Sequence, residues 1–338
     1  MIYPKQLVIE TDVTNDVKEL LKVTSQKIKE AFVILESTTI PDISPRYANQ
    51  LVVKGVTWFK EWMSVFCHLN PDLDKYSIYN MIYLNQNQVA LLEDRGITSI
   101  KDMPEELAQE KQLLQIDLIK SGERIILKDK IKKFLDSFQY PIYFLDYETL
   151  SSVIPFFDGM SPYKDYPFQY SLHVLDKLDS EVRHTEYLHL ENSDPMPSLL
   201  KKLRKDIGDT GTIITWNMGY EKSCNEQMAN MYPQYKEFLN QLNDRIVDLM
   251  TPFFEKWFVD KDFFGSSSLK VVLPVVIPEL GYKGMDVSDG LEARRMWTQT
   301  VLEDKNQNNK DEIINDLLKY CELDTFAMVK IFELLRNL

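Results

Sequence analysis

The spacing of apolar side chains predicts a helical first part and a mixed α/β second part. Between Val13 and Leu35, apolar residues recur at the three- and four-residue intervals of an amphipathic helix. Farther on, the pattern predicts three strands, a helix, a strand and a helix, at residues 142–147, 168–175, 183–190, 196–206, 212–216 and 220–231. We therefore expect a mainly helical region at residues 1–135, followed by an α/β domain at residues 136–338.

A long amphipathic helix is predicted in the last part of the sequence, because apolar residues recur at helical spacing from Ile313 to Phe332. Tyr320 and Asp324 are four residues apart in it and share one face.

Two acidic residues directly follow an apolar run, Ile142 to Leu145, that is typical of a strand buried on both faces. Asp146 and Glu148 are two residues apart, so in an extended chain both side chains lie on the same face. Buried together, they need a cation or protons to neutralise them, and a hard divalent metal ion is the simplest choice. The alternative is an ordinary strand end whose acids lie in solvent.

A strand with Asp-x-Glu and a late helix with Tyr-x-x-x-Asp resemble the tyrosine subtype of the DEDD exonuclease superfamily, which has a ribonuclease H-like fold. The resemblance implies that Asp146, Glu148 and Asp324 hold two Mg²⁺ or Mn²⁺ ions and that Tyr320 orients the attacking water. It also implies an Asn-x-x-x-Asp motif, for which the chain offers Asn217 and Glu221. Glu thus stands where Asp is usual, and we expect Glu221 to act through an intervening water.

A closer resemblance covers residues 139–338. It is to an uncharacterised bacterial family, presumed exonuclease-like, and is carried by four blocks at residues 144–149, 167–173, 265–274 and 320–325. In that family the domain follows a RecB-type nuclease module that ends in a cysteine cluster. Here Cys67 alone stands near that position, so residues 1–135 are interpreted as a remnant of such a module, and no iron–sulfur cluster is expected.

Candidate contacts to a nucleic-acid strand come from two segments. In the turn at residues 265–270, Ser267 and Lys270 offer hydrogen bonds and charge to a phosphate, although a plain helix N-cap fits equally. Arg294 and Arg295 precede Trp297, a combination suited to a backbone and a stacked base; the alternative is a core Trp beside solvated arginines. Asn217 completes the predicted substrate-binding set.

Several other features have more ordinary interpretations. Residues 88–104 predict a helical hairpin that either grips a nucleic-acid backbone or simply links domains. Asp248 is a spare ligand or, more simply, a capping residue. Cysteines 67, 224 and 321 give no disulfide or zinc pattern, and Cys321 is expected in the core. The four histidines, at positions 68, 173, 184 and 189, show no ligand spacing.

Charge and hydropathy limit the possible partners. The 338 residues include 39 basic and 52 acidic ones, a net charge of −13, which argues against broad wrapping of nucleic acid. Bound metal ions can still offset the local field of a nuclease site. No apolar run is long enough to span a bilayer and Met1–Lys5 lacks a secretory signal, so a cytoplasmic location without membrane contact is expected.

The expected activity is metal-dependent 3′–5′ exonuclease hydrolysis of DNA or RNA, acting on single strands or 3′ ends. The alternative is a noncatalytic, nuclease-like module that binds nucleic acid or a protein, which the negative charge and the Glu221 departure favour.

Overall fold

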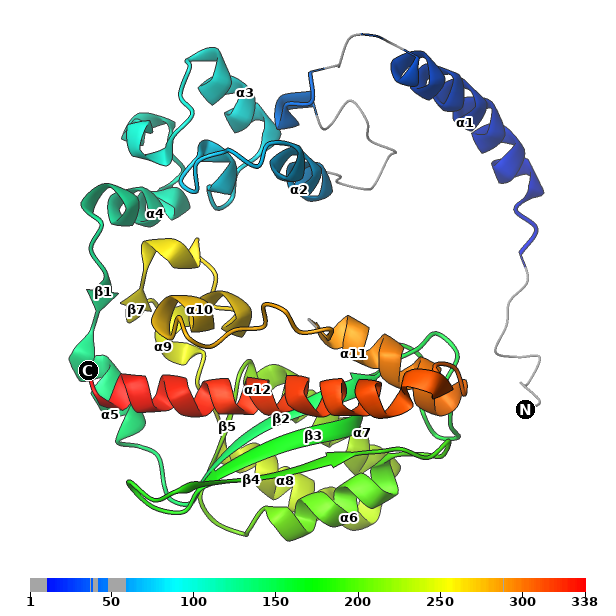
Figure 1. The fold of residues 1–338 in the computed structure, drawn as a ribbon, viewed down its shortest axis with the longest axis vertical. Helices are drawn as coiled ribbons and strands as arrows, with labels where there is room; N and C mark the ends of the chain where they lie inside the picture. Colours follow the sequence, from blue (N-terminus) through cyan, green and yellow to red (C-terminus); the bar gives the residue numbers. More distant parts are fainter. Residues whose placement is uncertain (1–10, 37, 39–41, 48–58, 288) are drawn as a thin grey trace. The chain divides into compact units, whose positions relative to one another are not determined.

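The computed structural model describes residues 11–36, 38, 42–47, 59–287 and 289–338 (Figure 1). The chain divides into an N-terminal unit, Met1–Asp102, and a C-terminal unit, Met103–Leu338. Residues 103–135, which the apolar pattern groups with the helical region, therefore belong to the C-terminal unit. The segment Met1–Lys5, on which the expectation about a secretory signal rests, lies outside the described residues.

The described part of the N-terminal unit is helical, as the sequence predicts. Its elements are α1 (Thr14–Leu35), α2 (Phe59–Leu69), η3 (Ile78–Asn80), α3 (Gln86–Asp94) and η4 (Ile100–Asp102). α1 covers the predicted amphipathic segment, and Cys67 lies in α2 with its side chain half-buried.

The helical hairpin predicted at residues 88–104 is half wrong. Gly96 does follow α3 with a left-handed φ of 69°. After it, however, the chain forms only the short 3₁₀ turn η4, because neighbouring backbone is paired elsewhere: the Ile100 N–H donates to the Tyr76 carbonyl and the Ile78 N–H to the Thr98 carbonyl. The next α-helix, α4 (Glu110–Ser121), begins in the C-terminal unit.

The C-terminal unit is built on a five-stranded mixed sheet, which confirms the predicted α/β class. Its strands, in the order β4-β3-β2-β5-β6, are β4 (Val182–Leu188), β3 (Tyr166–Leu175), β2 (Ile142–Leu150), β5 (Thr212–Thr215) and β6 (Ile246–Asp248). β2, β3 and β4 pair antiparallel, β5 is parallel to β2, and β6 is parallel to β5. The predicted strands and helices from 142 to 231 match the observed ones within a few residues.

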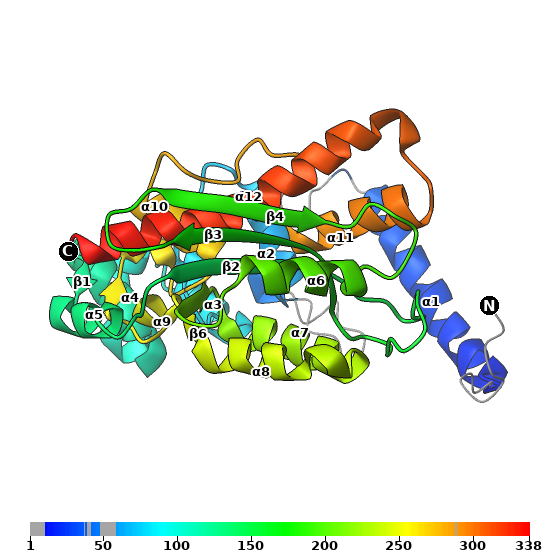
Figure 2. The same cartoon turned by 90° about the horizontal axis from the view of Figure 1, so that it is seen from below.

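Helices cover both faces of this sheet (Figures 1 and 2). On one face lie α12 (Lys310–Arg336) and α10 (Leu269–Val276), and on the other lie α6 (Met196–Asp206), α7 (Met218–Met231) and α8 (Lys236–Arg245). Successive side chains of β2 point alternately into the cores on the two faces of the sheet. Phe144 packs with Phe332 of α12, whereas Leu145 belongs to the core with α6 and α7. The period of two therefore turns Asp146 and Glu148 toward α12.

Shorter elements complete the unit. They are η5 (Glu105–Leu107), β1 (Ile125–Ile126), α5 (Lys128–Leu135), η6 (Pro233–Tyr235), α9 (Thr251–Phe254), β7 (Phe258–Val259), η7 (Lys261–Phe263), α11 (Gly290–Trp297), η8 (Thr298–Leu302) and η9 (Gln307–Asn309). β1 and β7 form a separate two-stranded sheet. Among the residues that the structure describes, none of the helices combines the length and the apolarity needed to cross a membrane.

Candidate metal centre

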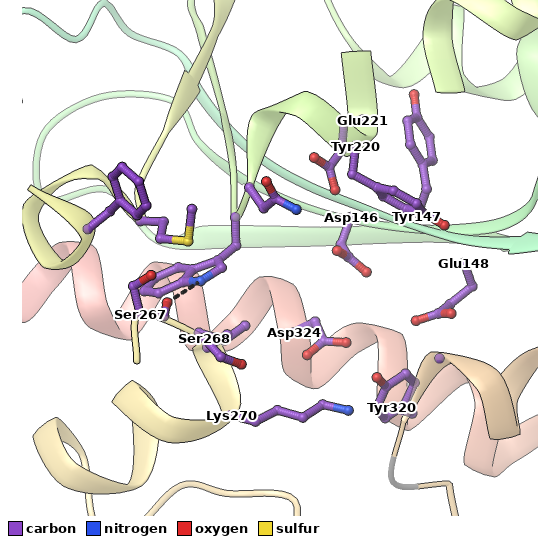
Figure 3. Close-up of a pocket in the computed structure, with 16 residues that line it drawn as sticks. Asp146, Tyr147, Glu148, Tyr220, Glu221, Ser267, Ser268, Lys270, Tyr320 and Asp324 are labelled. Carbon is purple, nitrogen blue, oxygen red and sulfur yellow. Dashed lines mark hydrogen bonds between the residues drawn. The ribbon is translucent and has the colours of Figure 1, made fainter. Parts of the chain in front are cut away.

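Three carboxylates meet in the space between β2 and α12 (Figure 3). Asp146, Glu148 and Asp324, hereafter the acidic cluster, each offer an oxygen within 4.8 Å of the others. Glu148 and Asp324 are almost fully enclosed, at 7% and 8% exposure. The resemblance to the DEDD exonucleases implies this meeting, since it assigns the three acids to one metal site.

Burial and mutual repulsion make the acidic cluster hold protons. The pKa of Asp146 is raised well above its usual range, first by burial and then by the Asp324 and Glu148 carboxylates. Burial raises the pKa of Glu148 to about 8, with Asp324 adding to it. The pKa of Asp324 rises to about 6 through burial, limited by the nearby Lys270 and by Tyr282, whose hydroxyl donates a hydrogen bond to Oδ1 of Asp324. Such a site stabilises a proton or a metal cation.

Glu221 lies apart from this group but lines the same cavity. It occupies the first turn of α7, is 2% exposed, and among the described residues nothing donates a hydrogen bond to its Oε2. Burial, followed by the charge of Asp248, raises its pKa to about 8. A carboxylate so deeply enclosed, with an unsatisfied oxygen, is a further possible donor to a cation or water in the cavity.

The start of α7 is fixed by Asp248, which acts as a cap. Its carboxylate accepts hydrogen bonds from the backbone N–H groups of Asn217 at 3.0 Å and Met218 at 3.1 Å. These bonds hold Asn217 in a left-handed conformation, with φ of 73°. The capping interpretation of Asp248 is therefore confirmed, and Asp248 is not among the residues that line the cavity.

The cavity beside the acidic cluster has a volume of about 600 Å³. Besides the carboxylates, it is lined by four more residues singled out from the sequence: Asn217, Ser267, Lys270 and Tyr320. Lys270 reaches in from the start of α10, and its ammonium lies 5.2 Å from the centre of the Tyr320 ring (Figure 3). The lining thus contains one cation beside several acids.

The remaining wall of the cavity is largely apolar. It includes Trp216, Met250 and Phe254. The indole N–H of Trp216 donates to the Ser267 carbonyl at 3.0 Å, which holds the aromatic ring against the loop before α10. The cavity therefore combines a charged end with an aromatic end.

Arg294 and Arg295, predicted to contact substrate, do not line the cavity. Arg294 donates to the Thr149 carbonyl and to Asp165, both at 2.9 Å, and so anchors the end of β2. Arg295 pairs with Glu292 at 3.2 Å on the surface. Trp297 is a core residue, stacked on Phe168 with 4.3 Å between ring centres.

Besides the cavity wall, sequence reasoning missed two residues that touch the acidic cluster. Tyr282 lies in the segment between α10 and α11, which has no periodic pattern that could have pointed to it. Gly290 begins α11, and a Cβ there would lie 3.3 Å from Oε2 of Glu148, so the glycine lets the helix approach that carboxylate. Cys321 is fully buried as predicted, and its Sγ lies 3.8 Å from Oδ2 of Asp146.

The histidines have no ligand spacing along the chain, but the fold brings two of them together. His173 of β3 and His184 of β4 are cross-strand neighbours whose rings stack at 4.4 Å. Together with Glu322 of α12, each offers a ligand atom within 4.8 Å of the others. Spacing along the chain could not reveal this, because the strand register creates it.

Residues 143–268 match a family described as "Domain of unknown function (DUF2779)". This match runs from the second residue of β2 to the residue before α10, so it leaves out α12.

Three curated proteins are similar to the chain. It is 24% identical to "Uncharacterized protein MG366" of Mycoplasma genitalium over 81% of the chain and 45% of that protein. It is 22% identical to "Uncharacterized protein UU173" of Ureaplasma parvum over 66% of the chain and 34% of that protein. It is 23% identical to "Uncharacterized protein MG366 homolog" of Mycoplasma pneumoniae over 61% of the chain and 34% of that protein. The chain spans less than half the length of these relatives. No solved structure matches it significantly.

Proposed function

We propose that this chain is a divalent-metal-dependent nuclease that removes nucleotides from 3′ ends of DNA or RNA. The observation that carries the proposal is the acidic cluster, in which three carboxylates from β2 and α12 offer oxygens within 4.8 Å of one another beside a cavity of about 600 Å³. Carboxylate oxygens are the ligands that Mg²⁺ and Mn²⁺ prefer.

The order of the strands supports a ribonuclease H-like fold. In such a fold, three antiparallel strands are followed by strands that lie parallel to the first. Here β2, β3 and β4 are the antiparallel set, and β5 and β6 extend the sheet from β2 in parallel. The proposed metal ligands lie on the first strand and on the last helix, the positions that the resemblance to the DEDD exonucleases assigns to them.

The acidic cluster fits a pair of divalent ions. Its acids are enclosed and their pKa values are raised, so in the absence of a cation they retain protons. When bound, two Mg²⁺ or Mn²⁺ ions would supply a hydroxide nucleophile and stabilise the leaving oxygen. Asp146 would contribute to both ions, Glu148 and Asp324 would hold one of them, and Glu221 would hold a water in the same cavity.

The other residues of the cavity have positioning roles in this proposal. Burial and the neighbouring carboxylates raise the pKa of Tyr320 above its usual range, so its phenol stays protonated and orients the attacking water as a hydrogen-bond donor. Lys270 and the Ser267 segment would bind the phosphate beside the acids. Asn217 would contact the nucleic-acid strand near Glu221.

A noncatalytic module that binds nucleic acid or a protein is the alternative. Two observations favour it: the net charge of −13, and the position of Glu221 outside the group of three carboxylates. A binding module has no need for a competent metal site, so the two functions differ in their response to Mn²⁺.

The test is hydrolysis of end-labelled DNA and RNA, single- and double-stranded, by the purified chain with Mn²⁺. We expect stepwise shortening from the 3′ end, loss of this activity in Asp324→Asn, and full activity in Asp304→Asn, whose acid is exposed in the loop before α12. Binding of the same strands without shortening, equal in both variants, would favour the noncatalytic module.

A further inference from the structure

A second group of potential ligands lies on the same face of the sheet as Asp146, in the neighbouring row of side chains, two residues away along the strands. The register pairs Asp146 with Ser171 and Ser171 with Glu186, while the neighbouring row pairs Phe144 with His173 and His173 with His184. Glu322 approaches from α12, with Oε1 at 3.7 Å from Nδ1 of His184. We call His173, His184 and Glu322 the histidine cluster.

Two hydroxyl groups orient the imidazoles. Oγ1 of Thr325 lies 2.8 Å from Nδ1 of His173, and Oγ of Ser171 lies 3.0 Å from Nε2 of His184. The two hydroxyls also contact each other, at 2.7 Å. The remaining ring nitrogens are Nε2 of His173 and Nδ1 of His184, and the latter faces the Glu322 carboxylate. A hydrogen bond at one ring nitrogen that presents the other is the usual support of a metal-binding histidine.

Glu186 adds an unsatisfied oxygen to this region. It follows His184 by two residues on β4, so both side chains lie on the face that α12 covers. Its Oε2 is enclosed and accepts no hydrogen bond from any residue that the structure describes. An enclosed carboxylate oxygen without a donor calls for an explanation, and a cation bound beside it supplies one.

From these contacts we infer a second metal site, for Zn²⁺ or a similar transition-metal ion, formed by His173, His184 and Glu322; Glu186, which lies outside this group of three, would move toward the ion to act as a fourth donor. Imidazole nitrogen selects such ions over Mg²⁺, which prefers oxygen. The burial that lowers the pKa of His173 to about 4 also keeps its ring neutral, as a ligand must be.

An ion in this cluster would turn His184 out of its stack on His173, because a bound metal lies in the plane of each imidazole and the two rings stack at 4.4 Å. Ligand atoms around a tetrahedral zinc ion are separated by about 3.3 Å, given bonds of about 2.0–2.1 Å, whereas here they lie within 4.8 Å of one another. The side chains of His184 and Glu322 are 24% and 48% exposed and can rotate inward. His173 is held in the core and provides the fixed point.

The site would tie α12 to the edge strand β4 and to its neighbour β3. Glu322 and Thr325 belong to the same helix as Asp324, so an ion in the histidine cluster would restrain the helix that carries the third acid of the acidic cluster. The inference does not depend on the proposed nuclease activity, because it concerns different donors and a different class of ion.

The test uses Co²⁺ as a coloured substitute for Zn²⁺. The full chain with Asp146→Asn, which weakens the acidic cluster, is stripped of metal and titrated with Co²⁺. We expect one equivalent to bind with the visible absorption of a tetrahedral site, and Zn²⁺ to displace it. Adding His184→Ala or Glu322→Ala should abolish the absorption. The matched changes His68→Ala, an exposed histidine of α2, and Glu312→Ala, an exposed acid of α12, should leave it intact.

Two results would overturn the inference: no tetrahedral Co²⁺ absorption in the Asp146→Asn chain, or absorption that survives both ligand changes. Because His184 and Glu322 are partly exposed, the metal-free variants should melt like their parent. If one variant unfolds, the other still tests the site, since each removes a ligand by itself.

Discussion

Tyr282 donates a hydrogen bond from its hydroxyl to Oδ1 of Asp324, and thereby limits how far burial raises the pKa of that carboxyl group. In Tyr282→Phe this bond is lost, so the pKa of Asp324 should rise further and its carboxylate should be less well oriented. We expect about tenfold weaker Mn²⁺ binding near neutral pH, the scale typical of lost support to a ligand. Calorimetric titration measures it, with the exposed Tyr163→Phe as the control. Equal affinities in the three chains would contradict this role.

The Asp146→Asn substitution should abolish hydrolysis without disturbing the fold. Asp146 is the acid proposed to contribute to both ions, and its amide replacement is neutral and nearly isosteric. Because the buried acid already favours its protonated form, the neutral side chain should be tolerated in the metal-free protein. Single-turnover kinetics and circular dichroism test the two expectations together, and turnover like that of the parent chain would refute the metal assignment.

Tyr320→Phe should instead leave partial activity. Only an orienting hydrogen bond is removed, which corresponds to about 2 kcal/mol and about a thirtyfold lower rate. The ring packs at 6.0 Å from that of Tyr282, and the phenylalanine keeps this contact. The single-turnover rate on each substrate is the measurement, and an unchanged rate on all of them would exclude Tyr320 from the reaction.

Mn²⁺ should raise the melting temperature of the chain. A cation that binds the folded site alone stabilises it by RT ln(1 + [L]/Kd), about 2.7 kcal/mol at a hundredfold excess over Kd, or a few degrees for a domain of this size. The shift should largely vanish in Asp146→Asn and Asp324→Asn and persist in Asp304→Asn. Differential scanning calorimetry with and without Mn²⁺ decides; superimposed curves for the parent chain would count against a metal centre.

The pH dependence of stability should carry the signature of raised pKa values. In the folded chain the pKa of Glu148 is about 8 and that of Asp324 about 6, above their usual 4.5 and 3.8. Between the usual and the raised pKa values, the folded state therefore binds more protons than the unfolded state. The contribution of these two acids to stability is full below about pH 4 and is lost as the pH rises toward 8. The Mn²⁺-induced shift should grow over the same range, because the metal displaces these protons.

Glu148→Gln isolates this effect from the titration of other groups. As the pH rises from about 5 to about 8, the metal-free parent should lose stability that the variant does not lose. The melting temperature of the variant should therefore rise relative to that of the parent. A constant difference across the range would mean that Glu148 keeps an ordinary pKa in the folded protein.

The sequence was informative where one pattern predicts both the secondary structure of a segment and the face on which its side chains lie. Alternation along β2 turns Asp146 and Glu148 to one face, and helical spacing along α12 places Tyr320 and Asp324 together. These patterns place residues within each element, whereas the meeting of the two elements in the acidic cluster was implied by the resemblance to the DEDD exonucleases.

Other parts of the site depend on tertiary packing and could not be read from spacing. Tyr282 reaches Asp324 from an irregular segment, and Arg294 is drawn to Thr149 and Asp165 rather than to the cavity. His173 and His184 become neighbours through the register between β3 and β4. The predicted second helix near residue 100 was lost because backbone pairing with residues 76–78 outweighed local propensity.

The placement of the third acid on α12 has a consequence for biosynthesis. Ribosomes complete β2 long before α12, so a nascent chain exposes Phe144 and the rest of that sheet face until the late helix arrives to cover them. During that interval Asp146 and Glu148 lack Asp324, so the proposed metal centre would be incomplete. Synthesis of α12 would thus both cover this face of the sheet and complete the acidic cluster, so the proposed metal centre could form only after α12 has been made.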